Sequence, residues 1–433
     1  MIKKLLLGAA ALTLAGAAIA HDASHDSHED FTLIHAGKVL AVPGKAPQSE
    51  QTIIIHDGKI VGIEAGYVED DEATIIDGKD MFFLPGLIDS HVHLRSEWSP
   101  TSRWESVLLE PGDVAFQAAK HAKTTLMAGF TAVQDVGGPN EIFALKRAIN
   151  KGLVPGPHIQ AAGSAISITG GHGDTHGFRR KLIPHMQSDT ICDGPAECRA
   201  AVRQAVKNGA DVIKITATGG VLSNTNAGTD QQFFKDELEA IVEAATKMGR
   251  KVTAHAHGRI GIESALKAGV QSIEHGTYLD EGTAELFKKH DATLVPTVMA
   301  GMTVVDWAEN KDWLPPNSVK KALEVGPQMQ DMARLAYENG VNIAFGTDTG
   351  VSEHGKNAEE FTYMVAAGMS EMEAIESATT VAAKHIGLDS IIGTLEKGKY
   401  ADLIGVDGNP LKKIEELRDV DFVMKGGKVY KGN

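Results

Sequence analysis

The sequence predicts an α/β protein, in which a (β/α)8 barrel is joined to a small β-sandwich domain formed by both chain ends. Through the middle of the chain, short apolar segments rich in β-branched residues alternate with helical segments, a pattern typical of parallel strands connected by helices. The two ends instead carry short β-type runs separated by turns. Neither end is long enough for a core of its own, so we expect them to form one domain together.

Eight segments of the middle region have the length and composition of buried strands. They are residues 87–91, 131–135, 158–161, 212–216, 252–255, 272–275, 294–297 and 343–348. Helical periodicity occurs between most of them, as in residues 111–128, 197–208, 235–248 and 318–339. Eight successive β/α units predict a closed barrel of the TIM type.

The chain ends supply the strands of the second domain. At the N-terminal side the β-type runs are residues 52–56, 59–63 and 74–76, with turns at Asp57-Gly58 and Asp77-Gly78. At the C-terminal side they are residues 393–396, 401–406, 422–425 and 428–430. The predicted domains are therefore residues 31–83 and 391–433 for the two parts of the sandwich and residues 84–390 for the barrel.

The first thirty residues are predicted to be a secretory signal peptide followed by a polar N-terminal tail. Residues 1–20 combine Lys3 and Lys4 with an apolar stretch and a small-residue cleavage site that ends at Ala20, the pattern of a signal peptide. The apolar stretch is about 15 residues long and a membrane span needs roughly 20, which favours cleavage over anchoring. Residues 21–30 are polar and expected to be disordered. We therefore expect a secreted or periplasmic protein with no membrane contact after cleavage.

The charge balance narrows the class of partner. The formal net charge is −15, and removal of the predicted leader with its two lysines makes it more negative. Nucleic acid and anionic membrane surfaces both attract basic patches. The composition therefore argues against nucleic acid as a partner.

The chain has two cysteines, Cys192 and Cys198, separated by a short segment that contains Gly194 and Pro195. In an oxidising compartment, two cysteines this close are expected to form a disulfide. Two free thiols are the alternative.

Polar residues stand at the ends of the predicted barrel strands. His91 and His93 are two positions apart, so a strand would present both imidazoles on one face, where they could bind one metal ion. Four further residues stand at or near the C-terminal ends of other strands, where barrel enzymes carry their catalytic groups. The six candidate metal ligands are His91, His93, Lys214, His255, His275 and Asp348.

Six such residues are too many for one tetrahedral zinc ion and suit a pair of divalent ions. Lys214 is unusual in this set, because an ammonium group cannot bind a cation. A lysine that has reacted with carbon dioxide to form a carbamate, an N-carboxylated lysine, could bridge both ions. The alternative is a lysine paired with an acidic neighbour, although burial between Ile213 and Ile215 would be costly without a purpose.

With these residues the chain resembles the amidohydrolase superfamily. Residues 85–93 resemble its strand-one motif, and Lys214, His255, His275 and Asp348 stand where its bridging lysine, two further histidines and aspartate would. Residues 398–404 resemble its sandwich-domain signature. Further segments, 168–173, 192–194, 218–221 and 255–258, are similar to the imidazolonepropionase-like branch, which contains Xaa-Pro dipeptidases, lysine/arginine carboxypeptidases and ochratoxin-degrading amidases. Imidazolonepropionase itself is a poorer match, since it resembles a mononuclear site without a bridging lysine.

The resemblance implies metal-assisted hydrolysis by two divalent ions, with Zn²⁺ expected and manganese or cobalt also compatible. Asp348 would act as general base and then as general acid. His255 matches the ligand position, and His257 is interpreted as a substrate contact. His172 and Tyr278 are the other candidate substrate contacts, with a solvated turn as the alternative for the loop of His172. The resemblance also implies a homo-oligomer, with an octamer as one candidate.

The predicted function is hydrolysis of an amide bond to a C-terminal amino acid by an exported binuclear amidohydrolase. Dipeptides, Xaa-Pro bonds, N-acyl amino acids and ochratoxin A fall within this small-molecule and dipeptide-like class. Two alternatives remain from the sequence: a lactonase or phosphotriesterase that uses the same site, and a non-catalytic periplasmic metal- or solute-binding protein.

Overall fold

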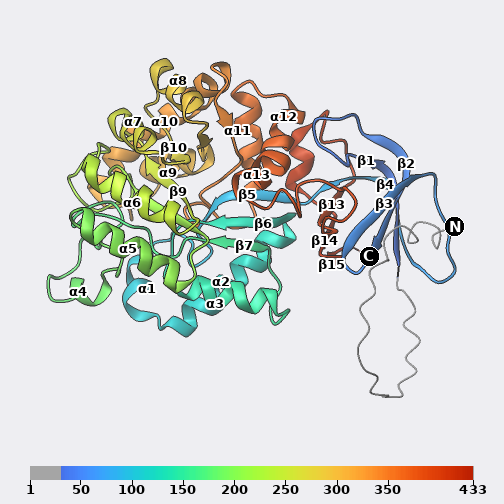
Figure 1. The fold of residues 1–433 in the computed structure, drawn as a ribbon, viewed down its shortest axis with the longest axis horizontal. Coiled ribbons are helices and arrows are strands. Elements are labelled where there is room, and N and C mark those ends of the chain that lie inside the picture. The colour runs from blue at the N-terminus through green and yellow to red at the C-terminus, as the bar shows by residue number, and fades with distance from the viewer. Residues whose placement is uncertain (1–30, 433) are drawn as a thin grey trace.

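The computed structural model describes residues 31–432. The predicted signal peptide, residues 1–20, and the predicted tail, residues 21–30, lie outside the described residues. The α/β fold class is confirmed: a barrel of strands and helices stands beside a β-sheet domain to which both chain ends contribute (Figure 1). No helix within residues 31–432 is both long and apolar enough to cross a lipid bilayer.

Eight parallel strands form the barrel, in two hydrogen-bonded groups with the orders β5-β6-β7 and β12-β11-β10-β9-β8. They are β5 (Leu87–Val92), β6 (Phe130–Asp135), β7 (His158–Ala161), β8 (Val212–Thr216), β9 (Lys251–Ala256), β10 (Ser272–His275), β11 (Thr293–Val295) and β12 (Asn342–Ile343). A bridge between Ile166 and Ile215 joins the two groups on one side. On the other side the amide of Ser90 donates to the carbonyl of Phe345 at 2.9 Å, a distance typical of paired strands, which closes the barrel.

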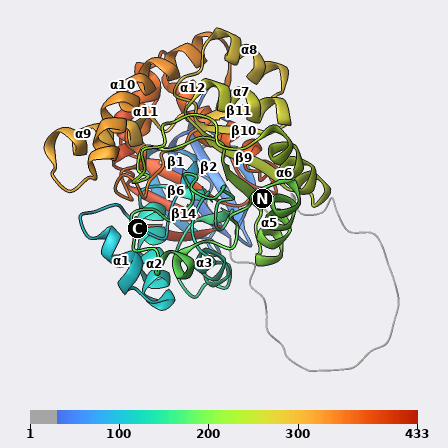
Figure 2. The ribbon, with the colours of Figure 1, turned by 90° about the vertical axis from the view of Figure 1, so that its left-hand side faces the viewer.

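Helices surround these strands, as Figure 2 shows in the view along the barrel. They are α1 (Ser102–Leu108), α2 (Pro111–Met127), α3 (Glu141–Asn150), α4 (Ile183–Met186), α5 (Pro195–Asn208), α6 (Lys235–Lys247), α7 (Arg259–Ala268), α8 (Glu281–Lys289), α9 (Val298–Asn310), α10 (Pro316–Glu338), α11 (Glu360–Ala366), α12 (Glu371–Glu376) and α13 (Ala382–His385), with shorter helical turns η2 (Asn357–Glu359), η3 (Ser377–Val381) and η4 (Ile414–Arg418). In α6, Leu238 and Ile241 are buried at helical spacing and pack toward the barrel core. Strands covered by helices in this way are buried on both faces, and every residue of β8 is buried.

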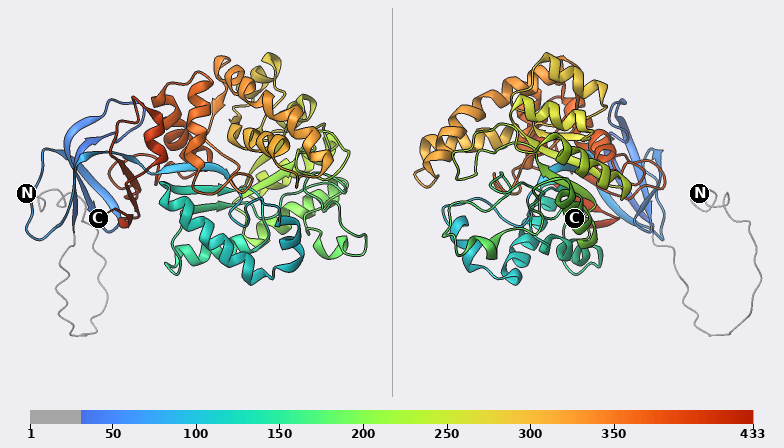
Figure 3. Two further views of the ribbon diagram at one scale, coloured as in Figure 1. Left: turned by 180° about the vertical axis from the view of Figure 1, so that it is seen from behind. Right: turned by 60° about the vertical axis from the view of Figure 1, so that its left-hand side comes forward.

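The second domain is a single seven-stranded sheet with the order β15-β14-β13-β4-β1-β2-β3. Its strands are β1 (Thr32–Val39), β2 (Gln48–His56), β3 (Lys59–Ala65), β4 (Thr74–Pro85), β13 (Leu403–Val406), β14 (Phe422–Lys425) and β15 (Lys428–Lys431). C-terminal β13 pairs antiparallel with N-terminal β4, with Leu403 opposite Pro85, so the two ends lie side by side (Figure 3).

The sheet runs directly into the barrel strand that carries the first two candidate ligands. Only Gly86 separates β4 from β5, and its amide donates to the carbonyl of Asp402 at 2.9 Å. A Cβ atom at position 86 would lie 2.1 Å from Oγ1 of Thr131, so the close approach of β6 requires glycine there. The sheet therefore fixes the start of β5, four residues before His91.

Three strand predictions differ from the structure. Residues 393–396 are not a strand, because Gly393 is left-handed at φ +88° and leads into a turn. The seventh barrel strand ends at Val295 and not at Thr297, whose left-handed backbone begins α9. The eighth strand is Asn342–Ile343 and not 343–348, and Asp348, at the end of the predicted range, has a left-handed backbone at φ +58°.

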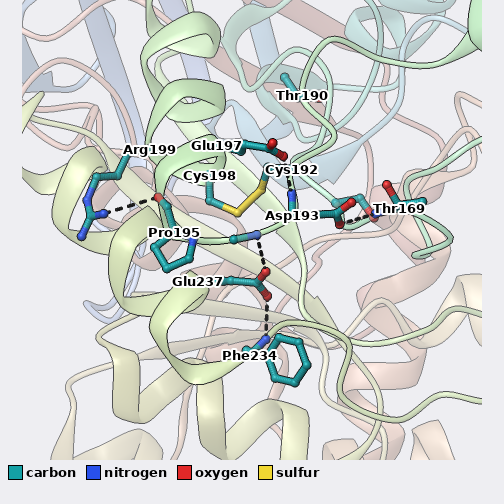
Figure 4. Close-up of a disulfide and its surroundings, with 12 residues drawn as sticks. Thr169, Thr190, Cys192, Asp193, Pro195, Glu197, Cys198, Arg199, Phe234 and Glu237 are labelled. Atoms are coloured by element: carbon teal, nitrogen blue, oxygen red, sulfur yellow. Dashed lines mark hydrogen bonds between the residues drawn. A yellow bond between two sulfur atoms is a disulfide. The ribbon is translucent and has the colours of Figure 1, made fainter.

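Cys192 and Cys198 are joined by a disulfide with a sequence separation of 6, which ties the segment before α5 to the first turn of that helix (Figure 4). The amide of Cys192 donates to the carbonyl of Ser167, in the segment that follows β7. Within the loop, the amide of Gly194 donates to the buried Glu237 carboxylate of α6 at 2.6 Å. The disulfide therefore lies where the β7 segment, α5 and α6 meet.

Replacement of both cysteines, Cys192→Ser with Cys198→Ser, should lower the free energy of unfolding by about 2 kcal/mol, the value expected for release of so short a loop. Urea unfolding of the oxidised proteins measures the difference. Under a strong reductant the variant and the parent protein should unfold together. Equal stability of the two oxidised proteins would contradict the prediction.

Candidate metal centre and active site

The C-terminal ends of the barrel strands surround a cavity of about 380 Å³. All six predicted metal ligands line it, and so do two of the three predicted substrate contacts. These residues are His91, His93, Lys214, His255, His275, Asp348, His172 and His257. The structure thus brings together side chains that are up to 257 positions apart in the sequence.

A first cluster forms between β5 and the segment that follows β12. His91, His275 and Asp348 each offer a ligand atom within 4.8 Å of the other two. Oδ1 of Asp348 lies 3.4 Å from Nε2 of His91 and 3.1 Å from Nε2 of His93. Burial alone would raise the pKa of Asp348, but His91 and His93 hold it well below its usual value. The carboxylate is therefore ionised and can bind a cation.

A second cluster forms at the ends of β9 and β10. His255, His257 and His275 offer ligand atoms within 4.8 Å of one another, and His275 belongs to both clusters. His257 was interpreted from the sequence as a substrate contact. In the structure its ligand atom, like that of His255, lies within 4.8 Å of the ligand atom of His275. The choice of His255 as the ligand stays a prediction.

Hydrogen bonds orient the imidazoles, as is usual for metal-binding histidines. Nδ1 of His91 donates to Glu274 at 2.6 Å, and Nδ1 of His93 donates to the carbonyl of Gly137 at 2.8 Å. Nδ1 of His257 bonds Thr277 and Nδ1 of His275 bonds Thr297, at 2.8 and 2.7 Å. In all four rings Nε2 is the nitrogen left for the cavity.

His255, His257 and His275 are held in the neutral form that binds metals. Burial lowers the pKa of His255 and of His275 well below the usual value, and it lowers the pKa of His257 to about 4. Neutral imidazoles beside one ionised carboxylate are the donor set of zinc and related divalent ions. The residues present therefore fit a metal centre.

Lys214 occupies the middle of β8 with its side chain in the cavity and only 4% exposed. Burial lowers the pKa of its amine. Glu274 and Asp348 are the carboxylates with the strongest opposing effect, and both are paired with histidines. Among residues 31–432 no carboxylate forms an ion pair with Lys214, so the alternative of a simple acidic partner finds no support.

Glu274 is a site residue that the sequence did not single out. It is fully buried beside His275 in β10, accepts the hydrogen bond of His91 and also bonds the hydroxyl of Thr253. Burial would raise its pKa, but His91 keeps it below the usual value, so the group is a carboxylate. An acid within an otherwise apolar strand, directly before a candidate ligand, was the signal that could have identified it.

Asp89 is not among the residues that line the cavity, although strand alternation places it on the same face as His91 and His93. Its carboxylate is fully buried and accepts hydrogen bonds from Thr347 Oγ1 at 2.6 Å and from Asn357 Nδ2 at 2.7 Å. Asp89 therefore connects β5 to the segment that carries Asp348, and its role is to position both.

Two of the predicted substrate contacts, His172 and His257, line the cavity, and the third, Tyr278, does not. His172 lines the cavity, stacks on His255 with ring centroids 4.2 Å apart, and bonds Ser223 through Nδ1. Burial lowers its pKa to about 3, so the ring is neutral. Tyr278 is not among the lining residues, and its half-buried ring packs against the core.

Arg95 is a cavity residue that the sequence did not single out. It is half-buried, it follows β5, and its Nε forms no hydrogen bond with any described residue. Burial lowers its pKa, while Glu141 and Asp135 oppose that effect. An arginine with a free donor beside a metal centre is suited to bind a carboxylate. Arg179 and Arg180 are exposed and lie outside the cavity lining.

One wall of the cavity is apolar. It is formed by side chains of the loop of residues 219–232, of α9 and of α10, namely Val221, Leu222, Ala300, Val304, Val325 and Met329. The loop is held in place by Lys321 of α10, whose Nζ donates to the carbonyls of Gly220 and Ser223 at 2.6 and 2.8 Å. The site therefore combines a polar metal centre with a fixed apolar wall.

Comparisons with known proteins agree with this geometry. The model of the amidohydrolase family matches residues 82–430. Ochratoxinase of Aspergillus niger is 34% identical over 368 residues, which are 81% of this chain and 75% of the relative. Two solved structures cover 93% of this chain and 100% of their own: an Xaa-Pro dipeptidase with methionine bound in the active site (43% identity, TM-score 0.88) and a prolidase complexed with N-methylphosphonate-L-proline (31% identity, TM-score 0.85).

Glu274→Gln should reduce metal affinity or turnover by roughly 10- to 100-fold, because glutamine lacks the charge that holds the N–H of His91. Metal titration and kcat on an amide substrate measure the effect. Glu237→Gln is the matched control, since Glu237 is also buried but bonds backbone amides at the start of α6. If both variants bind metal and turn over like the parent protein, Glu274 has no positioning role.

Proposed function

The chain belongs to the amidohydrolase family, and from this premise we propose that it is a binuclear enzyme that hydrolyses the amide bond to a C-terminal amino acid. Its assignment as a metal-dependent hydrolase of amide bonds, related to ochratoxinase and Xaa-Pro dipeptidase, follows from the family and the site. The observation that carries the proposal is the convergence of neutral imidazoles, Lys214 and Asp348 on one cavity.

We assign one ion to His91, His93 and Asp348 and the other to His255 and His275, with Zn²⁺ as the metal. Lys214 would join them after its neutral amine adds to carbon dioxide and loses a proton to give a carbamate. Its buried position in the cavity, without an acidic partner among residues 31–432, supports this assignment. When bound, the ions would acidify a water molecule and polarise the scissile carbonyl.

The chain's own residues would move the proton and hold the substrate. Asp348, within 3.4 Å of both His91 and His93, would accept a proton from water and return it to the leaving amine. His172 and His257 face the same cavity as neutral rings and would hold the substrate carbonyl. No nucleophilic serine or cysteine is needed, because water attacks the amide directly.

Arg95 and the apolar wall support a substrate with a free carboxylate and an apolar group. The guanidinium would bind the C-terminal carboxylate, and Val304 and Met329 would contact the apolar side chain. Dipeptides, Xaa-Pro dipeptides and N-acyl amino acids have this form. Ochratoxin A is a candidate of the same class, in keeping with the ochratoxinase relative.

We also propose that the protein is exported and forms a homo-oligomer. The disulfide supports an oxidising compartment. Trp104, Leu108 and Phe116, on α1 and α2, are 69%, 71% and 81% exposed, and large exposed apolar side chains of this kind are suited to a subunit contact.

Asp348→Asn should lower the rate of amide hydrolysis by roughly 100- to 10,000-fold, because asparagine cannot accept and return the proton. Mass spectrometry of reactions with dipeptides, N-acyl amino acids and ochratoxin A measures turnover, with chelated enzyme as the inactive control. Lactones and phosphotriesters in the same panel test the esterase alternative. Faster turnover of those esters than of any amide would overturn the proposed substrate class.

Arg95→Gln should lower kcat/KM by roughly 10- to 100-fold for substrates with a free C-terminal carboxylate, since a hydrogen bond to a charged group is lost. The same substrates with an amidated C-terminus should show little change. Arg180→Gln, at an exposed position outside the cavity, is the matched control. An equal loss of kcat/KM on both kinds of substrate would show that Arg95 does not bind the C-terminal carboxylate.

A further inference from the structure

A second cluster of metal-binding side chains lies outside the cavity. Glu97, His121 and His354 each offer a ligand atom within 4.8 Å of the other two, and none of them lines the cavity. They come from three places: the loop after β5, the helix α2, and the segment that follows Asp348. The cluster thus lies where the two segments that carry His93 and Asp348 meet α2.

Hydrogen bonds to backbone carbonyls set the tautomers of both histidines. Nδ1 of His121 donates to the carbonyl of Leu94 at 2.8 Å, which leaves a lone pair on Nε2. Nε2 of His354 donates to the carbonyl of Ser96 at 3.1 Å, which leaves a lone pair on Nδ1. A second nitrogen bonded to a carbonyl is the usual environment of a metal-binding histidine.

The free nitrogen of His354 points to a missing partner. The residue is 7% exposed, and its buried Nδ1 forms no hydrogen bond with any described residue. The ring stacks on His121 with centroids 4.4 Å apart and planes 20° apart, so the two imidazoles do not bond each other in their planes. A buried acceptor without a partner is costly, and a cation would supply one.

Glu97 adds the negative charge. Its Oε2 accepts the amide of His354 at 2.8 Å, and this bond leaves Oε1 available. Glu97 is half-buried, so an ion can reach the cluster from solvent. Burial lowers the pKa of His121, and burial with the adjacent His121 lowers that of His354 to about 3, so both rings are neutral.

We propose that Glu97, His121 and His354 bind a divalent transition-metal ion, distinct from any ion of the active site. Two imidazoles and one carboxylate suit zinc or cobalt, with a water molecule as the fourth ligand, whereas calcium and magnesium prefer oxygen ligands throughout. Because Ser96 and Trp98 of the β5 loop and Gly350 of the following segment line the cavity, the ion would hold together two sides of the substrate site.

The test counts ions in the full-length protein. The parent protein, Glu97→Gln, His121→Gln and His354→Gln are loaded with Zn²⁺, freed of excess metal by gel filtration and analysed by mass spectrometry of the elements. Each cluster variant should retain one ion fewer per chain than the parent protein. Glu353→Gln should retain the parent count, since this exposed neighbour pairs with Lys356 and not with the cluster.

Cobalt provides a second readout. The visible absorption of the Co²⁺-loaded protein should lose a component in Glu97→Gln and keep it in Glu353→Gln. Glu97 is half-buried in a loop, so this variant decides the question even if a histidine variant does not fold. An unchanged zinc count and an unchanged cobalt spectrum in Glu97→Gln would overturn the proposal.

Discussion

The buried carboxylate of Asp89 is the contact on which the site depends. The eighth barrel strand has only two regular residues, and beyond it separate backbone bonds, such as that from the amide of Asp348 to the carbonyl of His91, take the place of a continuous ladder to β5. Asp89 replaces part of that ladder, because it accepts bonds from Thr347, Asn357 and the amide of His91. Burial raises its pKa to about 6, and these donors oppose that effect, so the bonds are made to a group that would otherwise favour protonation. Through it, β5 and Asp348 keep a fixed spacing.

The electrostatics of the centre follow from burial of more acceptors than donors. His255, His257 and His275 are neutral, Glu274 and Asp348 are ionised, and burial lowers the pKa of the Lys214 amine. Such an arrangement is costly without a cation, because ionised carboxylates in a low-dielectric interior need compensation. His275 and Asp348 also adopt left-handed backbone conformations at φ +73° and +58°, which are strained for residues other than glycine. Strain and uncompensated charge at the same positions are typical of a site built for a ligand.

The sequence predicted the eight barrel strands and the six candidate metal ligands, which all line the cavity, because both are encoded locally. A period of two places His91 and His93, and short β-branched runs mark the strands. What it did not predict depends on tertiary contacts. Glu274 is recognised only when folding brings its carboxylate to His91, and Arg95 only when its side chain is found to line the cavity. Two strands end earlier than their composition indicated, and the left-handed backbone of Thr297 and Asp348 within the predicted ranges was not foreseen, since non-glycine residues rarely adopt that conformation.

The apolar wall is fixed by the packing of α9 against α10, and this packing depends on two glycines. A Cβ atom at Gly301 would lie 2.3 Å from Sδ of Met329, and one at Gly326 would lie 2.8 Å from the carbonyl of Gly301. The two helices therefore touch through their backbones. That close approach directs Met329 toward the cavity, and the same helix α10 supplies Lys321, which holds the loop of residues 219–232. The width of the pocket and the position of its loop are thus set by one helix pair, while the metal centre is set by the barrel. Substrate preference can change in the helix pair without any change in the residues that perform the hydrolysis.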